Sequence, residues 1–271
     1  MKISFCLTTY NKKELLEITI QNYMINRKEN YELIVSDGCS TDGTVEFLQE
    51  LKQNNVIDTL ILSQYRDNGE WEGFKKTLPH VTGEYFYLIT DDDYFDFRAI
   101  DILVENLKQN PQIDFLIADG MDFHVNHVKD SNYHHKLKKA NTTKINRNGL
   151  IHGVCGLGLF IKSELINQLD LFSPKFGKRT DKTVTTTLMD SEYVGASTNI
   201  KTYVAIKNEK SNSHLARYDY QSIEQIDPLN DPTKDFLCDA AFFKQRFDVS
   251  QSILDQCKNA NPEIIIYEKE D

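Results

Sequence analysis

The chain has 271 residues, of which 31 are Lys or Arg and 41 are Asp or Glu, giving a formal net charge of −10. This acidic balance argues against a general nucleic-acid-binding protein, whose phosphate contacts require clustered Lys and Arg. The 5 cysteines lie far apart and form no CxxC pair, which argues against a disulfide scaffold or a zinc ribbon and favours a reducing compartment.

Apolar spacing predicts alternating strands and helices over about the first 120 residues. Strands are predicted at residues 3–8, 31–36, 57–62, 85–90 and 113–118. Helices are predicted between them, near residues 16–24, 47–51, 71–78 and 97–109. Strands and helices that alternate in this way form βαβ units, so we expect an α/β fold with a mostly parallel sheet flanked by helices.

This alternation breaks after residue 120. Residues 124–147 are basic and contain four of the 7 histidines, and the glycine-rich apolar stretch 153–161 then returns to core-like composition. Residues 220–258 are predicted to be helical. Since no linker is evident, we expect a single main domain at residues 1–220, divided near residue 120, and a C-terminal helical extension at residues 221–271.

Polar clusters follow three of the predicted strands. Residues 8–11 follow the first strand, residues 37–44 the second, and residues 91–93 the fourth. Ligands of open α/β sheets bind beyond the carboxyl ends of the strands, so these clusters are expected to share one site. The competing interpretation of residues 37–44 is ordinary loop chemistry, because Asp-Gly turns with Ser or Thr are common in loops.

Three consecutive carboxylates, Asp91, Asp92 and Asp93, form the third cluster. Like charges this close repel one another unless a cation or solvent relieves them. Oxygen ligands of this kind suit Mg²⁺ or Mn²⁺ holding substrate phosphates. The alternative is a solvated turn or the acidic first turn of the following helix.

Together these segments resemble a family 2 glycosyltransferase with the GT-A fold. The matching segments are the opening strand and TYN turn at 3–11, the D-G-x-S-x-D-x-T turn at 37–44, Asn68-Gly69, Gly83-Glu84-Tyr85 and Thr90 to Asp93. Their order and spacing match over about the first 120 residues, and the joint match is specific. The resemblance implies a Rossmann-type GT-A sheet, with a nucleotide-sugar-binding half at 1–120 and an acceptor-side half at 121–220.

The resemblance also implies the residues of the site. Asp37 would accept a hydrogen bond from the base, and Asp91 would approach the ribose or the metal. The nucleotide-sugar contacts implied are those of Thr8, Tyr10, Asn11, Asp37, Asn68, Gly69 and Asp91. The metal ligands implied are Asp91, Asp92, Asp93 and His214, the last of which could equally be a surface histidine.

Enzymes of this family resemble one another in inverting the anomeric centre, which requires a general base at the acceptor hydroxyl. Asp181 is the first candidate, because it opens an apparent helix as the acid of the family's pattern does. Asp190 and Glu192 are alternatives, and a plain helix N-cap is the competing interpretation of Asp181. The Arg-Asn pair that the family often carries after its Asn-x-Gly is missing, and Lys75 or Lys76 could replace its diphosphate contact.

We therefore expect a Mn²⁺- or Mg²⁺-dependent transferase that moves a sugar from a nucleotide-diphosphate sugar, with UDP-sugar favoured, to a hydroxyl of a glycan or lipid-linked glycan. Inversion and a role in surface polysaccharide or lipopolysaccharide synthesis are implied. One alternative is a nucleotidyltransferase of similar fold, although the segment 10–14 lacks the glycine-rich phosphate loop of that class. The other is a non-catalytic nucleotide- or glycan-binding protein.

The sequence also predicts where the protein works. The apolar run at the N-terminus ends at Thr8, too early for a secretory leader, and no run of about 18 apolar residues is found. We expect a cytoplasmic protein, with peripheral contact between the basic stretch 124–147 and the inner face of a membrane as a further hypothesis. The oligomeric state is not predicted.

Overall fold

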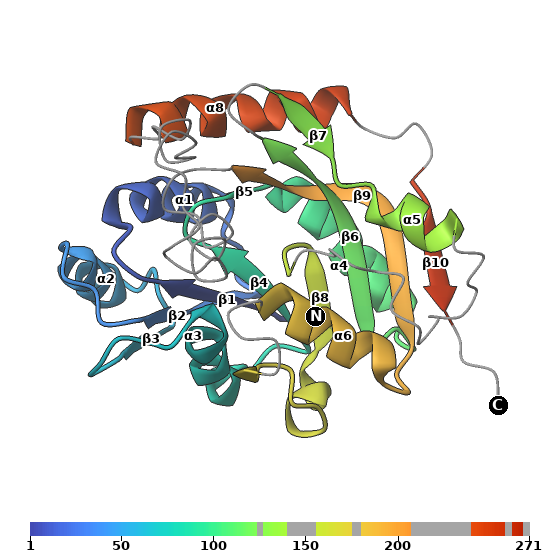
Figure 1. Cartoon of the computed structure of the whole chain (residues 1–271), viewed down its shortest axis with the longest axis horizontal. Coiled ribbons are helices and arrows are strands. Elements are labelled where there is room, and N and C mark those ends of the chain that lie inside the picture. The colour runs from blue at the N-terminus through green and yellow to red at the C-terminus, as the bar shows by residue number, and fades with distance from the viewer. Residues whose placement is uncertain (124–126, 140–155, 175–179, 207–239, 258–261, 268–271) are drawn as a thin grey trace, which may run out of the picture.

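The structure is a computed structural model that describes residues 1–123, 127–139, 156–174, 180–206, 240–257 and 262–267. Its strands are β1 (Ile3–Thr9), β2 (Tyr31–Asp37), β3 (Thr59–Leu62), β4 (Tyr85–Thr90), β5 (Tyr94–Phe95), β6 (Phe115–Phe123), β7 (Val128–Asp130), β8 (Leu159–Lys162), β9 (Gly195–Ile206) and β10 (Ile264–Tyr267). Its helices are α1 (Lys13–Asn26), α2 (Thr44–Gln53), α3 (Glu70–Thr77), α4 (Phe97–Gln109), α5 (Tyr133–Lys139), α6 (Thr180–Asp190) and α8 (Ala240–Gln256), with short 3₁₀ helices at Leu78–His80 and Ser163–Asn167. Within the described residues the strands form one sheet, which lies at the centre of the molecule in Figure 1.

The N-terminal half of the sheet follows the predicted pattern. The five predicted strands and the four helices between them all form, although β3 begins two residues later than expected and β6 runs on to Phe123. β1 pairs in parallel with β2 on one side and β4 on the other, with Thr9 opposite Asp37 and Thr8 opposite Thr90. This register brings the three polar clusters to the same edge of the sheet.

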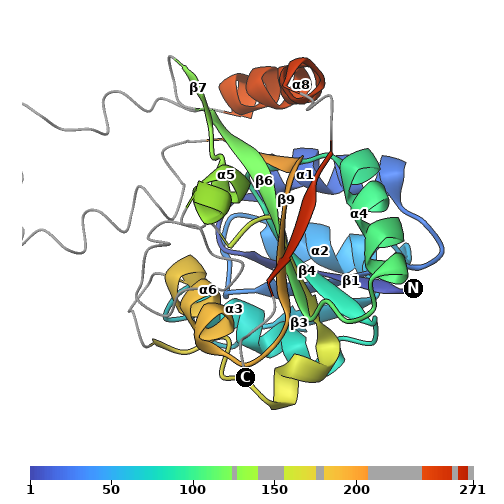
Figure 2. The ribbon, with the colours of Figure 1, turned by 90° about the vertical axis from the view of Figure 1, so that its right-hand side faces the viewer.

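The sheet becomes mixed beyond β4. β8 lies between β4 and β6 and is antiparallel to both, whereas β9 runs parallel to β6 past an irregularity at residues 118–120. In Figure 2, α4 lies on one side of the sheet, and α5 and α6 lie on the other. The sheet is therefore parallel where the polar clusters gather and mixed in the half that carries α6.

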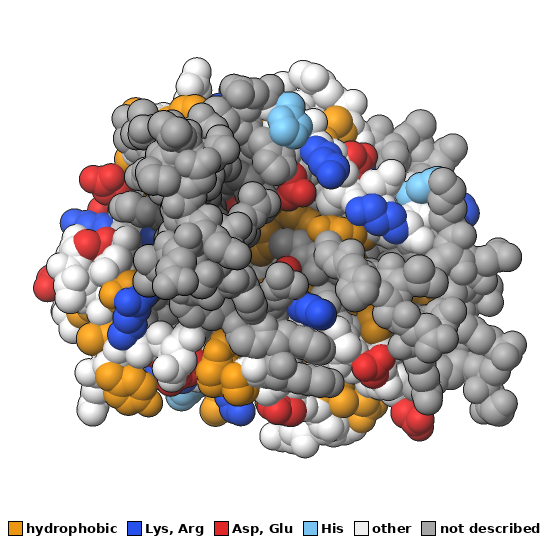
Figure 3. Space-filling model, viewed as in Figure 1, with side chains coloured by type: hydrophobic (Ala, Val, Ile, Leu, Met, Phe, Trp, Pro, Cys, Tyr) orange, Lys and Arg blue, Asp and Glu red, His pale blue; other side chains and the backbone are white. Residues whose placement is uncertain are grey.

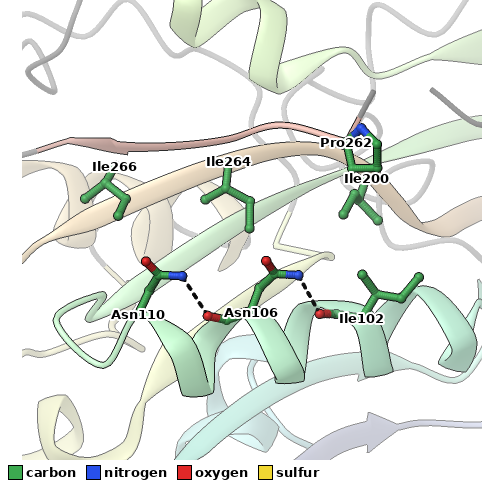
Figure 4. Close-up of a pocket in the computed structure, with 7 residues that line it drawn as sticks. All are labelled: Ile102, Asn106, Asn110, Ile200, Pro262, Ile264 and Ile266. Carbon is green, nitrogen blue, oxygen red and sulfur yellow. Dashed lines mark hydrogen bonds between the residues drawn. The ribbon is translucent and has the colours of Figure 1, made fainter. Parts of the chain in front are cut away.

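The C-terminal part contains a helix within the span 220–258 that was predicted to be helical, and an unexpected strand. Residues 220–239 of that span lie outside the described residues. α8 lies against β9 and α1, and Phe243 and Phe247 are buried there. After α8 the chain forms β10, which pairs antiparallel with β9 and so belongs to the main sheet. A pocket between α4 and β10 is lined by isoleucine side chains, by Pro262 and by two asparagines whose amides donate to backbone oxygens of α4 (Figure 4). None of the described helices is sufficiently long and apolar to cross a bilayer.

Aromatic packing holds β1 in place. Phe5 is fully buried and makes edge-to-face contacts with Tyr23 of α1, Tyr87 of β4 and Phe97 of α4, with ring centroids 5.8, 5.8 and 5.5 Å away. Each such pair contributes about 0.5–1.5 kcal/mol beyond the area it buries. The strand that carries the first polar cluster is thus fixed relative to both neighbouring helices.

Helix α3 approaches the end of β1 unusually closely. A Cβ atom added to Gly73 would lie 2.0 Å from Oγ1 and 2.9 Å from Cβ of Thr8. No real pair of side chains is packed this tightly, so only glycine fits at this position without movement of the helix. The close approach holds the N-terminal turn of α3 over the edge of the sheet where the polar clusters meet.

We expect Gly73→Ala to destabilise the protein by about 1–3 kcal/mol, because overpacking costs more than the roughly 1 kcal/mol that alanine contributes to a helix interior. Urea unfolding monitored by circular dichroism measures the change. Gly38→Ala is the control, since its Cβ would meet other atoms at 3.5 Å or more and the residue's φ is not positive. Equal stability of the two variants would contradict the steric explanation.

Candidate functional site

An ion-pair cluster joins the ends of β1 and β4. The Nζ atom of Lys12 lies 3.0 Å from Oδ1 of Asp91 and 3.0 Å from Oδ2 of Asp92. Thr9 donates a hydrogen bond of 2.8 Å to the other oxygen of Asp91, and all four side chains are buried. The sequence pattern does not single out Lys12, although a lysine directly after the first polar cluster is the signal that could have found it.

The charges in this cluster shift one another's pKa values. Burial raises the pKa of Asp91 to about 6, against the lowering effect of the Lys12 ammonium. Burial acts to lower the pKa of Lys12, but the negative charges of Asp91 and Asp92 outweigh it and raise that pKa above its ordinary value. Lys12 therefore remains a cation throughout the physiological range.

The third acid of the triplet has a different environment. Oδ1 of Asp93 accepts a hydrogen bond of 2.8 Å from the backbone N–H of Ile206, and Oδ2 accepts one of 2.5 Å from Thr90. These bonds tie the end of β4 to the end of β9. Of the three consecutive acids, Asp91 and Asp92 share the Lys12 ammonium, while Asp93 holds two parts of the sheet together.

The second polar cluster presents an open hydrogen-bond acceptor. Oδ2 of Asp37 accepts the N–H of Ser40 at 2.9 Å, whereas Oδ1 is buried and has no partner among the described residues. Oδ2 of Asp67 is likewise buried and has no partner among the described residues. Asp67 lies beside the second cluster, because a Cβ added to Gly38 would lie 3.6 Å from Cγ of Asp67. Buried polar atoms are seldom left unbonded, so each of these oxygens is suited to a donor from a ligand.

The predicted base-pocket residues connect the first two clusters. Asn11, at a φ of 51°, accepts the N–H of Thr41 at 2.7 Å through Oδ1, and its own N–H donates to Oγ of Ser40 at 2.9 Å. The guanidinium carbon of Arg66 lies 4.8 Å from the centre of the Tyr10 ring. The side chain of the third predicted residue, Thr8, instead lies beneath α3.

The Asn68-Gly69 pair shapes the start of α3. The backbone N–H and the amide of Asn68 both donate to Oε2 of Glu72 at 2.8 Å, and Gly69 has a φ of 153°, a conformation restricted essentially to glycine. Asn68 itself is exposed. Its observed contacts hold the loop that leads into α3.

The lysines considered for the diphosphate are both paired. Nζ of Lys76 lies 2.5 Å from Oδ1 of Asp67. Lys75 is exposed, and its Nζ lies 3.6 Å from Oδ1 of Asp170. The pairing of Lys76 places a positive charge beside the unpartnered oxygen of Asp67, whereas Lys75 lies on the surface.

Glu70 brings the predicted catalytic acid into the same site. It is the first residue of α3 and is partly buried. Burial and, after it, the negative charge of Asp181 raise its pKa to about 8, against the lowering effect of the Lys12 ammonium. Asp181, in the first turn of α6, therefore shares one electrostatic environment with Glu70, Lys12 and Asp91. The sequence pattern does not identify Glu70, because nothing in it shows that α3 starts at the site.

The alternative catalytic acids lie elsewhere. Asp190 ends α6 and Glu192 follows it, and both are exposed. At 1.5 Å per residue, Asp190 lies about 14 Å along the helix from Asp181. Of the three acids, Asp181 is the one whose charge raises the pKa of Glu70, as the charges of Asp91 and Asp92 also do. His214 lies outside the described residues.

The described part of the basic stretch carries mixed charge. Nζ of Lys138 lies 2.8 Å from Oε1 of Glu263, and Nζ of Lys136 lies 5.1 Å from the centre of the Tyr133 ring. Figure 3 shows Lys, Arg and His side chains over β7 and α5 on one face, with acidic side chains among them. Membrane contact by this stretch remains a prediction.

The donor set suits a divalent cation that prefers oxygen. Asp91 and Asp92 offer carboxylate oxygens from adjacent residues, the ligand type of Mg²⁺ and Mn²⁺. Among the described residues, however, no group of three or more His, Cys, Asp or Glu side chains is arranged to hold a metal. The protein by itself would supply a partial site centred on these two residues, and a ligand would complete it.

The chain is similar in sequence to known glycosyltransferases over part of its length. The chain is 26% identical over 111 residues to the poly-beta-1,6-N-acetyl-D-glucosamine synthase of Staphylococcus aureus, a match that covers 41% of this chain and 26% of the synthase. It is 29% identical over 138 residues to the abequosyltransferase RfbV of Salmonella typhimurium, covering 49% of this chain and 40% of that protein. The chain thus spans less than half the length of either relative.

Solved structures share the fold. S. aureus TarS 1-349 in complex with UDP-GlcNAc has a TM-score of 0.61 at 15% identity, covering 93% of this chain and 74% of that one. The mannosyltransferase PcManGT from Pyrobaculum calidifontis, in complex with GDP-Man and Mn²⁺, has a TM-score of 0.56 at 17% identity. This match covers 96% of this chain and 76% of the mannosyltransferase. The sequence model described as Glycosyl transferase family 2 matches residues 4–169. Since that match covers more than half of its residues, the chain belongs to glycosyl transferase family 2 and is a glycosyltransferase.

Proposed function

We propose that this glycosyltransferase moves a sugar from a UDP-sugar to a hydroxyl of a glycan or lipid-linked glycan, with inversion and with the help of a divalent cation. One observation carries the proposal. Asp91 and Asp92 pair with Lys12 at the carboxyl edge of the sheet, where Asp37 has an unpartnered oxygen, and Glu70 is affected by the charges of these residues and of Asp181. In the proposed function these groups would supply a phosphate-binding centre, a base pocket and a general base.

The unpartnered oxygen of Asp37 supports a uracil base. This buried acceptor suits an N–H donor such as the ring N–H of uracil, a donor that thymine and guanine also carry. Cytosine presents an acceptor at the equivalent ring position, so it would leave two acceptors facing each other. TarS, whose fold is similar, was solved in complex with UDP-GlcNAc, which is consistent with this choice.

Asp91 and Asp92 are the proposed ligands of the cation. When bound, Mg²⁺ or Mn²⁺ would stabilise the negative charge that develops on the diphosphate leaving group. The two aspartates lie in a buried setting, where electrostatic interactions are stronger than in water. The mannosyltransferase of similar fold was solved with Mn²⁺.

Asp181 is the proposed general base. As the acceptor oxygen bonds to the anomeric carbon, the bond from that carbon to the diphosphate oxygen breaks. The hydroxyl proton passes to the Asp181 carboxylate, and the electron pair leaves on the nucleoside diphosphate. Attack from the side opposite the leaving group inverts the centre.

The acceptor and the cellular setting are proposed from the relatives. One relative is named as the synthase of a poly-N-acetylglucosamine and the other as an abequosyltransferase. We therefore place this chain in surface polysaccharide or lipopolysaccharide synthesis, at the cytoplasmic face of a membrane where nucleotide-sugars and lipid-linked glycans meet.

A thermal-shift panel of UDP-, GDP-, CMP- and dTDP-sugars, with and without Mn²⁺, tests the donor. We expect a UDP-sugar with Mn²⁺ to stabilise the protein most, by about 2.7 kcal/mol at 100 times its Kd. A CMP-sugar should have little effect, because cytosine lacks the ring N–H. No shift with any donor would contradict the donor assignment.

Asp181→Asn should lower the transfer rate by a factor of about 100 or more while leaving the Kd for UDP near that of the wild type, because general bases contribute about 10²–10⁴-fold. Radiolabelled sugar transfer measures the rate, and isothermal titration measures UDP binding. Asp190→Asn, at the far end of the same helix, is the matched control and should retain activity. Near-normal turnover by Asp181→Asn would exclude it as the base.

Glu70 gives a pH dependence of stability in the metal-free protein. Its folded-state pKa is raised from 4.5 to about 8, so the folded protein keeps a proton that the unfolded chain releases. Its contribution to stability is therefore present at low pH and is lost as the pH rises from about 5 to about 8. Glu70→Gln should flatten this decline in urea unfolding with a chelator present, whereas Glu50→Gln, on the exposed face of α2, should not.

A further inference from the structure

Lys12 occupies a fixed position between the proposed metal ligands. Its backbone oxygen accepts the N–H groups of Leu15 at 3.1 Å and Leu16 at 2.9 Å, so the residue is the N-cap of α1. Its side chain is only 8% exposed and reaches both Asp91 and Asp92. The neighbouring Lys13 is directed to the surface, where Nζ lies 3.8 Å from Glu17.

This position has a consequence for charge. One ammonium already neutralises half of the charge on the two carboxylates. A divalent cation that joined the same buried pair alone would leave an excess of positive charge close to Lys12, which is unfavourable where water does not screen it. The diphosphate of a nucleotide-sugar would bring the negative charge that removes this excess.

We infer that Lys12 is a built-in counter-ion that makes binding of the divalent cation depend on the nucleotide diphosphate. Without nucleotide, Lys12 holds Asp91 and Asp92 together and keeps the affinity for the metal low. With nucleotide, the ammonium faces the added phosphate charge, and both carboxylates become available to the cation. Lys12 is in this sense a positioning residue, and the inference rests on the proposed function.

Titration with Mn²⁺ alone, followed by calorimetry and by the electron paramagnetic resonance signal of free Mn²⁺, tests the inference on the nucleotide-free protein. Lys12→Met should bind Mn²⁺ about tenfold more tightly or better than the wild type, because it removes the competing charge. Lys12→Arg retains the charge and should resemble the wild type, as should the surface control Lys13→Met. A purely structural role of Lys12 would not strengthen metal binding.

An unchanged Kd for Mn²⁺ in Lys12→Met, or tighter binding in Lys12→Arg as well, would overturn the inference. If melting shows that Lys12→Met is unfolded, Lys12→Gln replaces it, since its amide can still donate to a carboxylate. The wild type gives a second measure: saturating UDP should tighten Mn²⁺ binding by at least about tenfold, and equal binding would also overturn the inference.

These outcomes are distinct from failure of the proposed function. If the chain binds no UDP-sugar, the donor assignment fails, but the comparison of variants with Mn²⁺ alone needs no donor and still decides the role of Lys12. If UDP-sugar binds and Lys12→Met shows unchanged metal affinity, the proposed function stands and only the inference on Lys12 fails.

Discussion

The two ion pairs of Lys12 with Asp91 and Asp92 are the interaction on which the rest of the site depends. They join the turn after β1 to the turn after β4, and the three side chains involved are buried. Burying two adjacent carboxylates is costly unless a cation compensates them, and removing one partner of a buried pair typically costs about 3–5 kcal/mol. The charges of Asp91 and Asp92 are therefore compensated by Lys12 without any ligand, and these ion pairs fix the positions of the three side chains.

The parallel register of the sheet makes these pairs possible. Because β1 lies between β2 and β4, with Thr8 opposite Thr90 and Thr9 opposite Asp37, their polar ends meet at one edge. The absence of a side chain at Gly73 lets α3 pack closely against this edge. Glu70, at the start of α3, is then affected by the charges of Asp91 and Asp92. The pairing of the strands positions the three polar clusters. The close packing of α3 that Gly73 allows adds the carboxyl group of Glu70, a residue outside these clusters.

The sequence predicts this fold and site unevenly, for physical reasons. Apolar runs at strand spacing indicate buried segments, so strands β1, β2, β3, β4 and β6 and the acids at the ends of β2 and β4 were predictable. A four-residue strand such as β10 carries too little pattern, and its place beside β9 depends on contacts distant in the chain. Lys12 and Glu70 were missed because their roles depend on where a side chain reaches across the sheet edge. The proposal of Asp181 as the base came from the family resemblance, because the residue it interacts with electrostatically, Glu70, belongs to α3 and not to its own segment.

The two ends of the site are prepared differently for a ligand. At the base end, the acceptor of Asp37 is buried and unpartnered, so a donor that enters gains a hydrogen bond without displacing one. At the phosphate end, the oxygens of Asp91 are already bonded to Thr9 and Lys12, so a cation must compete with bonds that exist. Recognition of the base therefore has the lower initial cost and should precede full assembly of the phosphate end. Under the proposed function, the nucleotide diphosphate would supply the charge that makes binding of the cation favourable.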